Sequence, residues 1–210
     1  RTTEAADADN RYVLTCKNTD KICIFTNTGQ MHLLKVLDLP FGKFRDKGTP
    51  IDNLSNYDSK TENFIYIINL GAISSRKVIF GTKNAMLKVV DGSEFDVAKR
   101  TTAATKLNDG DELLFVRVLE ETADPEAADR TETLIMQSEK DFFLRIEVST
   151  IPEKKKGAVG VRGMKLGIGD VLTAIYLLKD DEAVSVEVKG KEVALNRLRT
   201  AGRDTKGTKR

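Results

Sequence analysis

The sequence has only one histidine and two cysteines, and this shortage removes several kinds of site from consideration. His32 has no nucleophile motif near it, and a strand position in a hairpin accounts for it without a catalytic role. Cys16 and Cys23 lack metal-ligand spacing and lie in apolar, strand-like stretches, which favours buried thiols over a disulfide or a metal site. We therefore expect no metal, no cofactor and a reducing, cytoplasmic environment.

Long hydrophobic runs are missing as well. No apolar stretch approaches the ~20 residues that a membrane-spanning helix needs, and residues 1–10 lack the apolar core of a signal peptide. These absences argue against a membrane protein. The chain starts with Arg1 rather than methionine, which indicates a piece of a longer protein with residues 1–10 as a flexible lead-in. We expect this piece to be a monomer.

Charge is segregated along the chain, although the net charge is only +2. Four segments hold 17 of the 34 basic residues and only three of the 32 acidic ones, so they carry +14 and the rest carries −12. These segments, the first to fourth basic loops, are residues 41–48, 97–106, 153–165 and 196–210. A segregated basic surface of this kind is typical of a polyanion binder.

The composition of the basic loops suits phosphate groups. Lysine supplies a compact charge, arginine adds a fork that can hold two phosphate oxygens, and interleaved glycines let the backbone approach closely. Only Phe41 and Phe44 could stack on single-stranded bases, so duplex DNA is favoured. The candidate DNA-binding residues are Lys43, Arg45, Lys47, Lys99, Arg100, Lys106, Lys154, Lys155, Lys156, Arg162, Lys165, Arg197, Arg199, Arg203 and Lys206.

A short motif that occurs twice marks an internal repeat. Residues 106–113 and 165–172 both read Lys-Leu-x-x-Gly-Asp-x-Leu, and each copy precedes an apolar or alternating stretch. At four places, short β-prone runs flank a turn rich in Gly, Asn, Asp or Ser, which predicts four hairpins. The paired runs are 22–25 with 30–36, 78–80 with 86–90, 134–137 with 142–148, and 184–188 with 191–195.

Each hairpin is followed by a basic loop with a small residue near its end, at Gly48, Ala104, Gly160 and Gly207. Repeats of roughly 50 residues with about four strands each are typical of propeller blades. We therefore predict an all-β, propeller-like fold in which residues 11–210 form one domain. The predicted blades are roughly 11–62, 63–113, 114–170 and 171–210.

Two segments carry more specific expectations. Apolar and polar residues alternate over 142–148, which predicts a strand with one face in the core and the other in water. Residues 120–131 are acidic and contain alanine and proline, which predicts a surface loop between strands.

Several spaced motifs, in order, resemble a family of known proteins. Residues 31–40 (MHLLKVLDLP) lead into 45–51 (RDKGTPI), which is similar to a blade of the C-terminal domain of the DNA gyrase and topoisomerase IV A subunits. Residues 157–166 (GAVGVRGMKL) resemble another blade motif of that domain, and 203–210 (RDTKGTKR) resemble its closing stretch. The resemblance covers 11–210 and implies a β-pinwheel of four-stranded blades.

The resemblance also implies a function. Such a domain has no chemistry of its own, and its basic perimeter bends and wraps duplex DNA for the cleavage and religation core of an ATP-dependent type IIA topoisomerase. The ATPase B subunit is then a partner through the full-length A subunit. The glycine- and arginine-rich box of gyrase has no match here, so gyrase and topoisomerase IV both stay open. The family's DNA contacts carry over to Arg45, Lys47, Lys154, Lys155, Lys156, Arg162, Lys165, Arg203 and Lys206.

Two other functions compete with DNA binding. A propeller-type interaction module could use the same loops to dock an acidic protein. An enzyme is disfavoured because no convergent carboxylate, nucleophile or metal set is visible. Tyr12, beside Arg11, opens an apolar strand rather than a catalytic motif, and Asp109 and Asp111 lack the further ligands of a calcium loop.

Overall fold

The regular structure of the chain consists mainly of short β-strands. The structure is a computed structural model that describes residues 10–43, 46–119, 132–179 and 182–210, and its regular elements are strands and single 3₁₀ turns, which confirms the all-β class. The strands are β1 (Lys21–Thr26), β2 (Gln30–Lys35), β3 (Phe64–Asn69), β4 (Lys77–Thr82), β5 (Met86–Asp91), β6 (Thr101–Ala103), β7 (Leu113–Val118), β8 (Glu132–Ser138), β9 (Phe142–Glu147), β10 (Val161–Arg162), β11 (Leu172–Lys179), β12 (Ser185–Val188), β13 (Lys191–Ala194) and β14 (Thr208–Lys209). The 3₁₀ turns are η1 (Val36–Asp38), η2 (Ile51–Asn53), η3 (Leu70–Ala72), η4 (Gly92–Phe95), η6 (Val148–Thr150) and η7 (Leu195–Arg197). Within these residues no helix is long and apolar enough to cross a membrane.

All four predicted hairpins are confirmed, as β1–β2, β4–β5, β8–β9 and β12–β13. Gly29, Ala85 and Asp141 occupy the same turn position in the first three, with φ angles of 75°, 60° and 63°. This left-handed conformation suits glycine and strains other residues. The sequence pattern had marked Gly29 and Asp141 as equivalent, and it missed Ala85, which is neither glycine nor a usual turn residue.

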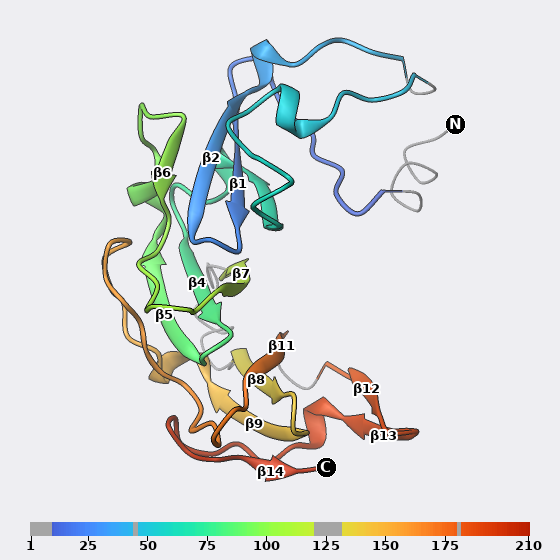
Figure 1. Cartoon of the computed structure of the whole chain (residues 1–210), viewed down its shortest axis with the longest axis vertical. Helices are drawn as coiled ribbons and strands as arrows, with labels where there is room; N and C mark the ends of the chain where they lie inside the picture. Colours follow the sequence, from blue (N-terminus) through green and yellow to red (C-terminus); the bar gives the residue numbers. More distant parts are fainter. Residues whose placement is uncertain (1–9, 44–45, 120–131, 180–181) are drawn as a thin grey trace, which may run out of the picture.

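The sheets are assembled by exchange of strands between neighbouring repeats (Figure 1). Sheet 1 has the order β3-β1-β2-β6, sheet 2 is β10-β5-β4-β7, and sheet 3 is β11-β8-β9-β14. In each sheet the outer strand (β6, β10 or β14) comes from the repeat that follows, and the inner strand (β3, β7 or β11) closes the other edge. The sheets therefore interleave along the chain and do not coincide with the contiguous blades expected from the sequence. Among the described residues, the fourth repeat contributes the outer strand β14 to sheet 3 and otherwise forms the two-stranded sheet β12-β13.

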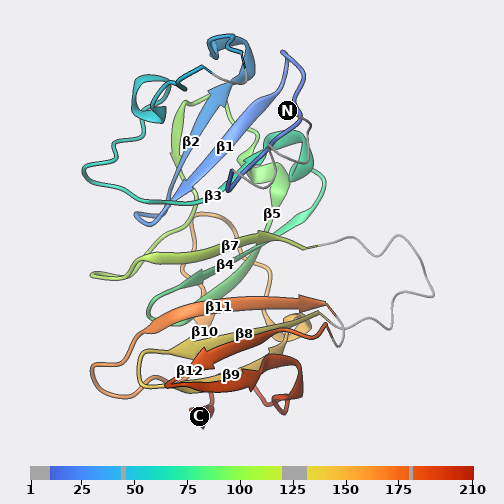
Figure 2. The ribbon, with the colours of Figure 1, turned by 90° about the vertical axis from the view of Figure 1, so that its right-hand side faces the viewer.

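Apolar residues fill the spaces between successive sheets, which stack along the long axis (Figure 2). Between sheets 1 and 2, the rings of Phe25, Phe80 and Phe95 lie 5.4–5.8 Å apart, mostly edge to face. Leu87 and Ile146 belong to the core between sheets 2 and 3. A third core joins sheet 3 to the β12–β13 hairpin. Each of these cores is shared by two repeats, so the repeats stabilise one another.

The expectation of one wet face for residues 142–148 is wrong. In β9, Leu144 and Ile146 are buried in the core between sheets 2 and 3, while Phe143, on the opposite face, is buried in the core beneath the fourth hairpin. Arg145 is also buried, at 9% exposure. Both faces of the strand are covered because sheet 3 is sandwiched between two neighbours, which alternation within one strand does not reveal.

The repeated Gly-Asp pair caps the turn of its own repeat's hairpin. The Asp111 carboxylate accepts hydrogen bonds from the backbone N–H of Asn84 at 3.0 Å and of Glu112 at 2.8 Å. Asp170 accepts one from the N–H of Lys140 at 3.2 Å. Both aspartates are buried, and the glycine before each has a positive φ. The motif is therefore a turn that fastens the inner strand to the hairpin.

Replacing Asp111 with alanine should lower the free energy of unfolding by about 2 kcal/mol, because buried N–H donors lose a charged acceptor. Chemical denaturation measures this change. Asp109→Ala is the matched control, since Asp109 is an exposed carboxylate two residues earlier and its removal should cost less than about 0.5 kcal/mol. Equal losses from the two variants would show that the Asp111 cap does not stabilise the turn.

Candidate nucleic-acid interface

The second, third and fourth basic loops gather on one side of the arc of sheets. Each hairpin leads into a basic loop, and the second, third and fourth basic loops contain or lead into the outer strands β6, β10 and β14. Figure 1 shows β6 and the second to fourth basic loops on the convex side of the arc, with β7 and β11 on the other side, whereas the chain that follows β2 and η1 extends away from the convex side. We call the second to fourth basic loops with β6, β10 and β14 the convex edge. Strand exchange therefore brings together cations that are far apart in the sequence.

Most predicted DNA-binding residues are exposed, and all of the exposed ones except Lys43 and Lys47 belong to this edge. Arg45 lies outside the described residues, as do the acidic stretch 120–131 and most of the expected lead-in. Lys156 and Arg203 are half-buried. The exposed residues are Lys43, Lys47, Lys99, Arg100, Lys106, Lys154, Lys155, Arg162, Lys165, Arg197, Arg199 and Lys206. The sequence thus identified side chains that solvent, and therefore a ligand, can reach.

Acidic residues in the 3₁₀ turns tie neighbouring basic loops together. The Asp38 carboxylate in η1 lies 3.7 Å from the Arg100 guanidinium. In η4, Glu94 pairs with the Lys155 ammonium at 3.5 Å, and its backbone oxygen accepts a hydrogen bond from the Lys156 ammonium at 2.9 Å. Asp38 and Glu94 are the third residues of equivalent 3₁₀ turns, so the contact repeats from one blade to the next.

The third and fourth basic loops are joined by a two-pronged ion pair. The Arg162 guanidinium donates through Nε and Nη2 to the two carboxylate oxygens of Asp204, the second at 2.9 Å. The hydrogen bond from Arg162 holds the pKa of Asp204 below its usual range, and the same contact raises the pKa of Arg162. Arg203 donates to the Arg162 carbonyl at 2.9 Å. Arg162 is therefore engaged within the protein, and a phosphate would have to compete with Asp204 for it.

The remaining cations form no salt bridge within the described residues, although Lys165 adds to the effect of Arg162 in lowering the pKa of Asp204. They are spread over all four loops and can bind an external anion. They are Lys43, Lys47, Lys99, Lys106, Lys154, Lys165, Arg197 and Arg199. The ammonium of Lys206 instead lies 4.8 Å from the centre of the Phe142 ring.

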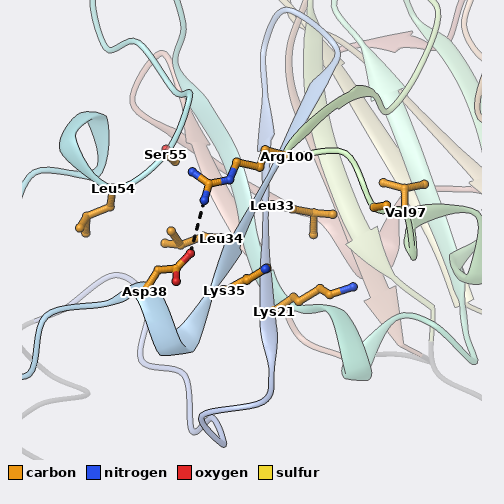
Figure 3. Close-up of a pocket in the computed structure, with 10 residues that line it drawn as sticks. Lys21, Leu33, Leu34, Lys35, Asp38, Leu54, Ser55, Val97 and Arg100 are labelled. Atoms are coloured by element: carbon orange, nitrogen blue, oxygen red, sulfur yellow. Dashed lines mark ion pairs between the residues drawn. The ribbon is translucent and has the colours of Figure 1, made fainter.

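A pocket of about 300 Å³ lies between β2, the segment after η2 and the start of the second basic loop (Figure 3). Its wall carries Lys21, Lys35 and Arg100, and its apolar lining includes Leu33 and Leu34. Figure 3 shows Arg100 reaching toward Asp38 across the opening. The pocket borders the second basic loop at Arg100, and it places Lys35, which the sequence had not singled out, beside the cations of that loop.

The positions that are equivalent in successive basic loops differ from those suggested by the spacing of small residues. Spacing places Ala104 with Gly160 and Gly207, but the backbone N–H groups of Ala104 and Gly163 make the equivalent bonds, to Gly29 at 2.8 Å and Ala85 at 2.7 Å. Gly160 and Gly207 both precede the first paired residue of an outer strand, β10 or β14. The loops have different lengths, so counting residues misaligns them.

The first basic loop repeats the sequence of the fourth in a different setting. Residues 47–49 and 206–208 both read Lys-Gly-Thr. Thr208 pairs with Phe143 in sheet 3, whereas residues 46–50 are exposed and form no strand. Among the described residues no sheet precedes sheet 1, so this copy has no hairpin to pair with.

His32 and the cysteines are structural residues. His32 is buried, its Nε2 lies 3.0 Å from the Glu62 carboxylate, and its Nδ1 lies 3.0 Å from the Thr101 hydroxyl. It therefore fastens β6 and the segment before β3 to β2. Burial raises the pKa of the Cys23 thiol to about 12, as expected for an inert thiol. Sequence inspection missed the partners Glu62 and Thr101 because they lie far from His32 along the chain.

Stacked four-stranded sheets that exchange outer strands, with cations on one edge, define a propeller-like domain of the β-pinwheel type. A sequence model of the family described as "DNA gyrase C-terminal domain, beta-propeller" matches residues 76–120 and 132–188. This chain belongs to that family, as its blade motifs predicted.

Known relatives and solved structures agree with this assignment. The DNA gyrase A subunit of Lawsonia intracellularis is 28% identical over 202 residues, which cover 92% of this chain and 23% of that protein. The DNA gyrase A subunit of Escherichia coli (strain K12) is 26% identical, with coverage of 93% and 22%. The C-terminal domain of DNA topoisomerase IV matches with a TM-score of 0.80 and 21% identity, covering 97% of this chain and 65% of that one. This chain thus spans about a quarter of the length of the curated relatives that it matches.

Proposed function

We propose that this domain binds and bends duplex DNA along its convex edge. The observation that carries the proposal is a set of six exposed cations on the convex edge that form no salt bridge within the described residues, Lys99, Lys106, Lys154, Lys165, Arg197 and Arg199. Each such cation can neutralise one phosphate and release a condensed counterion, which supplies most of the affinity of sequence-independent binding. A curved row of contacts favours a bent duplex, because bending brings more phosphates within reach.

The character of the edge favours a duplex over a single strand. Single-strand binding needs exposed aromatic rings on which bases stack. Among the described residues of the basic loops, only Phe41 is an aromatic residue, and the nearby Phe142 ring is approached by the ammonium groups of Lys206 and Lys209. Exposed lysine and arginine side chains instead contact the phosphate backbone.

In the whole protein, we propose that the domain presents bent or wrapped DNA to the cleavage core of a type IIA topoisomerase in the bacterial cytoplasm. The core performs the strand passage, and a B subunit supplies the ATPase. This domain then contributes no catalytic residue and needs no cofactor. The relatives named above are gyrase A subunits and a topoisomerase IV domain, which supports this role without choosing between the two enzymes.

Duplex binding by this chain should depend steeply on salt and little on sequence. If five to eight phosphates are neutralised, log K should fall with log[salt] with a slope of about −4.5 to −7. Fluorescence anisotropy with unrelated duplexes of equal length measures both properties, and a single strand of the same length is the control. Three results would contradict the proposal: no binding at low salt, tighter binding of the single strand, or a strong preference for one sequence. Capture of acidic proteins without DNA binding would favour the interaction module instead.

A further inference from the structure

Two buried cations lie behind the third and fourth basic loops, although neither belongs to a loop. Lys88 in β5 is 1% exposed, and its ammonium donates to the backbone carbonyls of Lys156 and Ala158, both at 2.7 Å. The carbonyl of Lys155 lies 3.3 Å from the same nitrogen. One side chain therefore gathers three carbonyl oxygens from the middle of the third basic loop.

Arg145 in β9 has the same role in the next repeat. It is 9% exposed, and its guanidinium donates to the carbonyl of Asn196 at 2.5 Å, with the carbonyl of Leu198 at 3.4 Å. Its Nε donates to the Thr133 hydroxyl at 3.0 Å. Both cations extend from the second strand of a hairpin, and each holds the basic loop of the repeat that follows.

We propose that Lys88 and Arg145 are positioning residues of the DNA interface, which hold the basic loops from behind so that their cations face outward. The inference rests on the proposed duplex binding and assigns a share of that function to residues that never touch DNA. The carbonyls bound by Lys88 and Arg145 point inward, and the neighbouring Lys154, Arg197 and Arg199 are exposed and unpaired within the described residues. An oxygen turned inward also no longer repels an approaching phosphate.

Because Lys88 is buried, its ammonium group requires the carbonyl oxygens of the loop as hydrogen-bond partners. An ammonium removed from water is stable only if other oxygens replace the lost hydration, and here loop carbonyls do so. Desolvation lowers the pKa of Lys88 to about 8, which is consistent with a site that accepts the cation only while the loop is in place. The loop and the buried cation therefore specify each other's positions.

The test compares Lys88→Met with Lys83→Met. Both variants remove one positive charge from a strand or turn of the second repeat, but Lys83 is partly exposed and paired with Glu112 rather than with a loop. Lys88→Met should weaken duplex binding roughly sixtyfold at 0.1 M salt, since the loop loses its charge-assisted hydrogen bonds and about two phosphate contacts, each a factor of about eight there. The salt slope should become shallower by about 1.8, because roughly two phosphate contacts lose their geometry. Lys83→Met should change the slope by at most about 0.9.

Hydrogen exchange and a pH series will distinguish a role of Lys88 in positioning the loop from a role in the stability of the fold alone. Amides of residues 154–158 should exchange faster in Lys88→Met and at the wild-type rate in Lys88→Arg, while amides of β4 and β8 stay protected in both. Because Lys88 loses its proton as pH rises through about 8, wild-type affinity should fall between pH 7 and 9. It should stay constant in Lys88→Arg. The charged groups around Lys88 are Glu94, Lys155 and Lys156, which both proteins share.

Each outcome has a distinct meaning. Equal affinities and slopes for Lys88→Met and Lys83→Met would overturn the positioning role, and so would unchanged exchange at 154–158. If the wild-type protein binds no duplex at all, the proposed function fails, while hydrogen exchange still decides whether Lys88 holds the loop. Arg145→Met and Arg145→Lys provide the same comparison for residues 196–199.

Discussion

Duplex affinity should fall roughly four thousandfold at 0.1 M salt when Lys154, Lys165, Arg197 and Arg199 are all replaced with glutamine, since each lost phosphate contact removes a factor of about eight there. These four side chains are exposed and form no salt bridge within the described residues, so their loss should leave the fold intact. The salt slope should become shallower by about 3.6. Anisotropy titrations at several salt concentrations measure both effects.

The matched control replaces four exposed lysines outside the basic loops, Lys17, Lys60, Lys140 and Lys189. The change in net charge is identical, so a diffuse charge effect would weaken both variants equally, and that result would contradict the assigned surface. Glutamine is preferable to charge reversal at Lys155 and Lys156. Both contact Glu94, and a glutamate there would repel it and disturb the loop itself.

Gly160→Ala should lower the free energy of unfolding by about 3 kcal/mol, because a side chain there overlaps a packed backbone. A Cβ at this position would lie 2.4 Å from the carbonyl oxygen of Leu87, and that backbone belongs to the centre of sheet 2. The cheapest relief is detachment of β10, which follows Gly160 directly. Thermal denaturation and hydrogen exchange at Val161 and Arg162 report these two consequences, and duplex affinity should fall as well.

Gly157→Ala is the control within the same loop. Nothing lies within 4 Å of a Cβ built on Gly157, so the substitution should change the free energy of unfolding by less than about 0.5 kcal/mol. Wild-type stability in Gly160→Ala would mean that β10 does not need the close approach to Leu87. If both variants lower the free energy of unfolding equally, the loss comes from any alanine in this loop rather than from the contact with Leu87.

Strand exchange couples DNA binding to the stability of the whole array. A basic loop is held at one end by its own hairpin and at the other by an outer strand in the preceding sheet. Bridges such as Glu94 with Lys155, and Asp204 with Arg162, then join loop to loop. Loss of one sheet would therefore release cations of two successive repeats, as expected for an array stabilised by nearest neighbours.

Local features of the fold were predictable from sequence. Hairpins such as β1–β2 depend on β-prone runs and turn residues that lie next to each other, so a short window contains the whole signal. The Gly-Asp pair at Gly169 and Asp170 was recognised as a turn for the same reason. The sequence-based prediction was wrong where a side chain contacts residues far away in the chain. Arg145 was predicted to face solvent, yet it is buried against carbonyls of the fourth repeat.

The candidate interface was likewise predictable from sequence only in its local features. Segregated charge marked the basic loops, and the described residues chosen from them are mostly exposed, because lysine and arginine avoid burial unless they are paired. Which of them are free could not be predicted. Arg162 and Arg197 look alike in sequence, but Asp204 engages Arg162 and leaves Arg197 unpaired within the described residues. Lys88 was missed because a lysine in a strand ordinarily faces water.

By itself the sequence determined the all-β class, the four hairpins, the family and the loops that carry positive charge, since each depends on composition or on neighbouring residues. Only the tertiary structure decided how the repeats interlock. Outer strands as short as Val161–Arg162 carry almost no signal of their own, and their pairing with Leu87 and Met86 is set by the edge that the preceding sheet leaves open. That pairing, with Lys88 and Arg145 behind the loops, is what arranges separate basic segments along one convex edge.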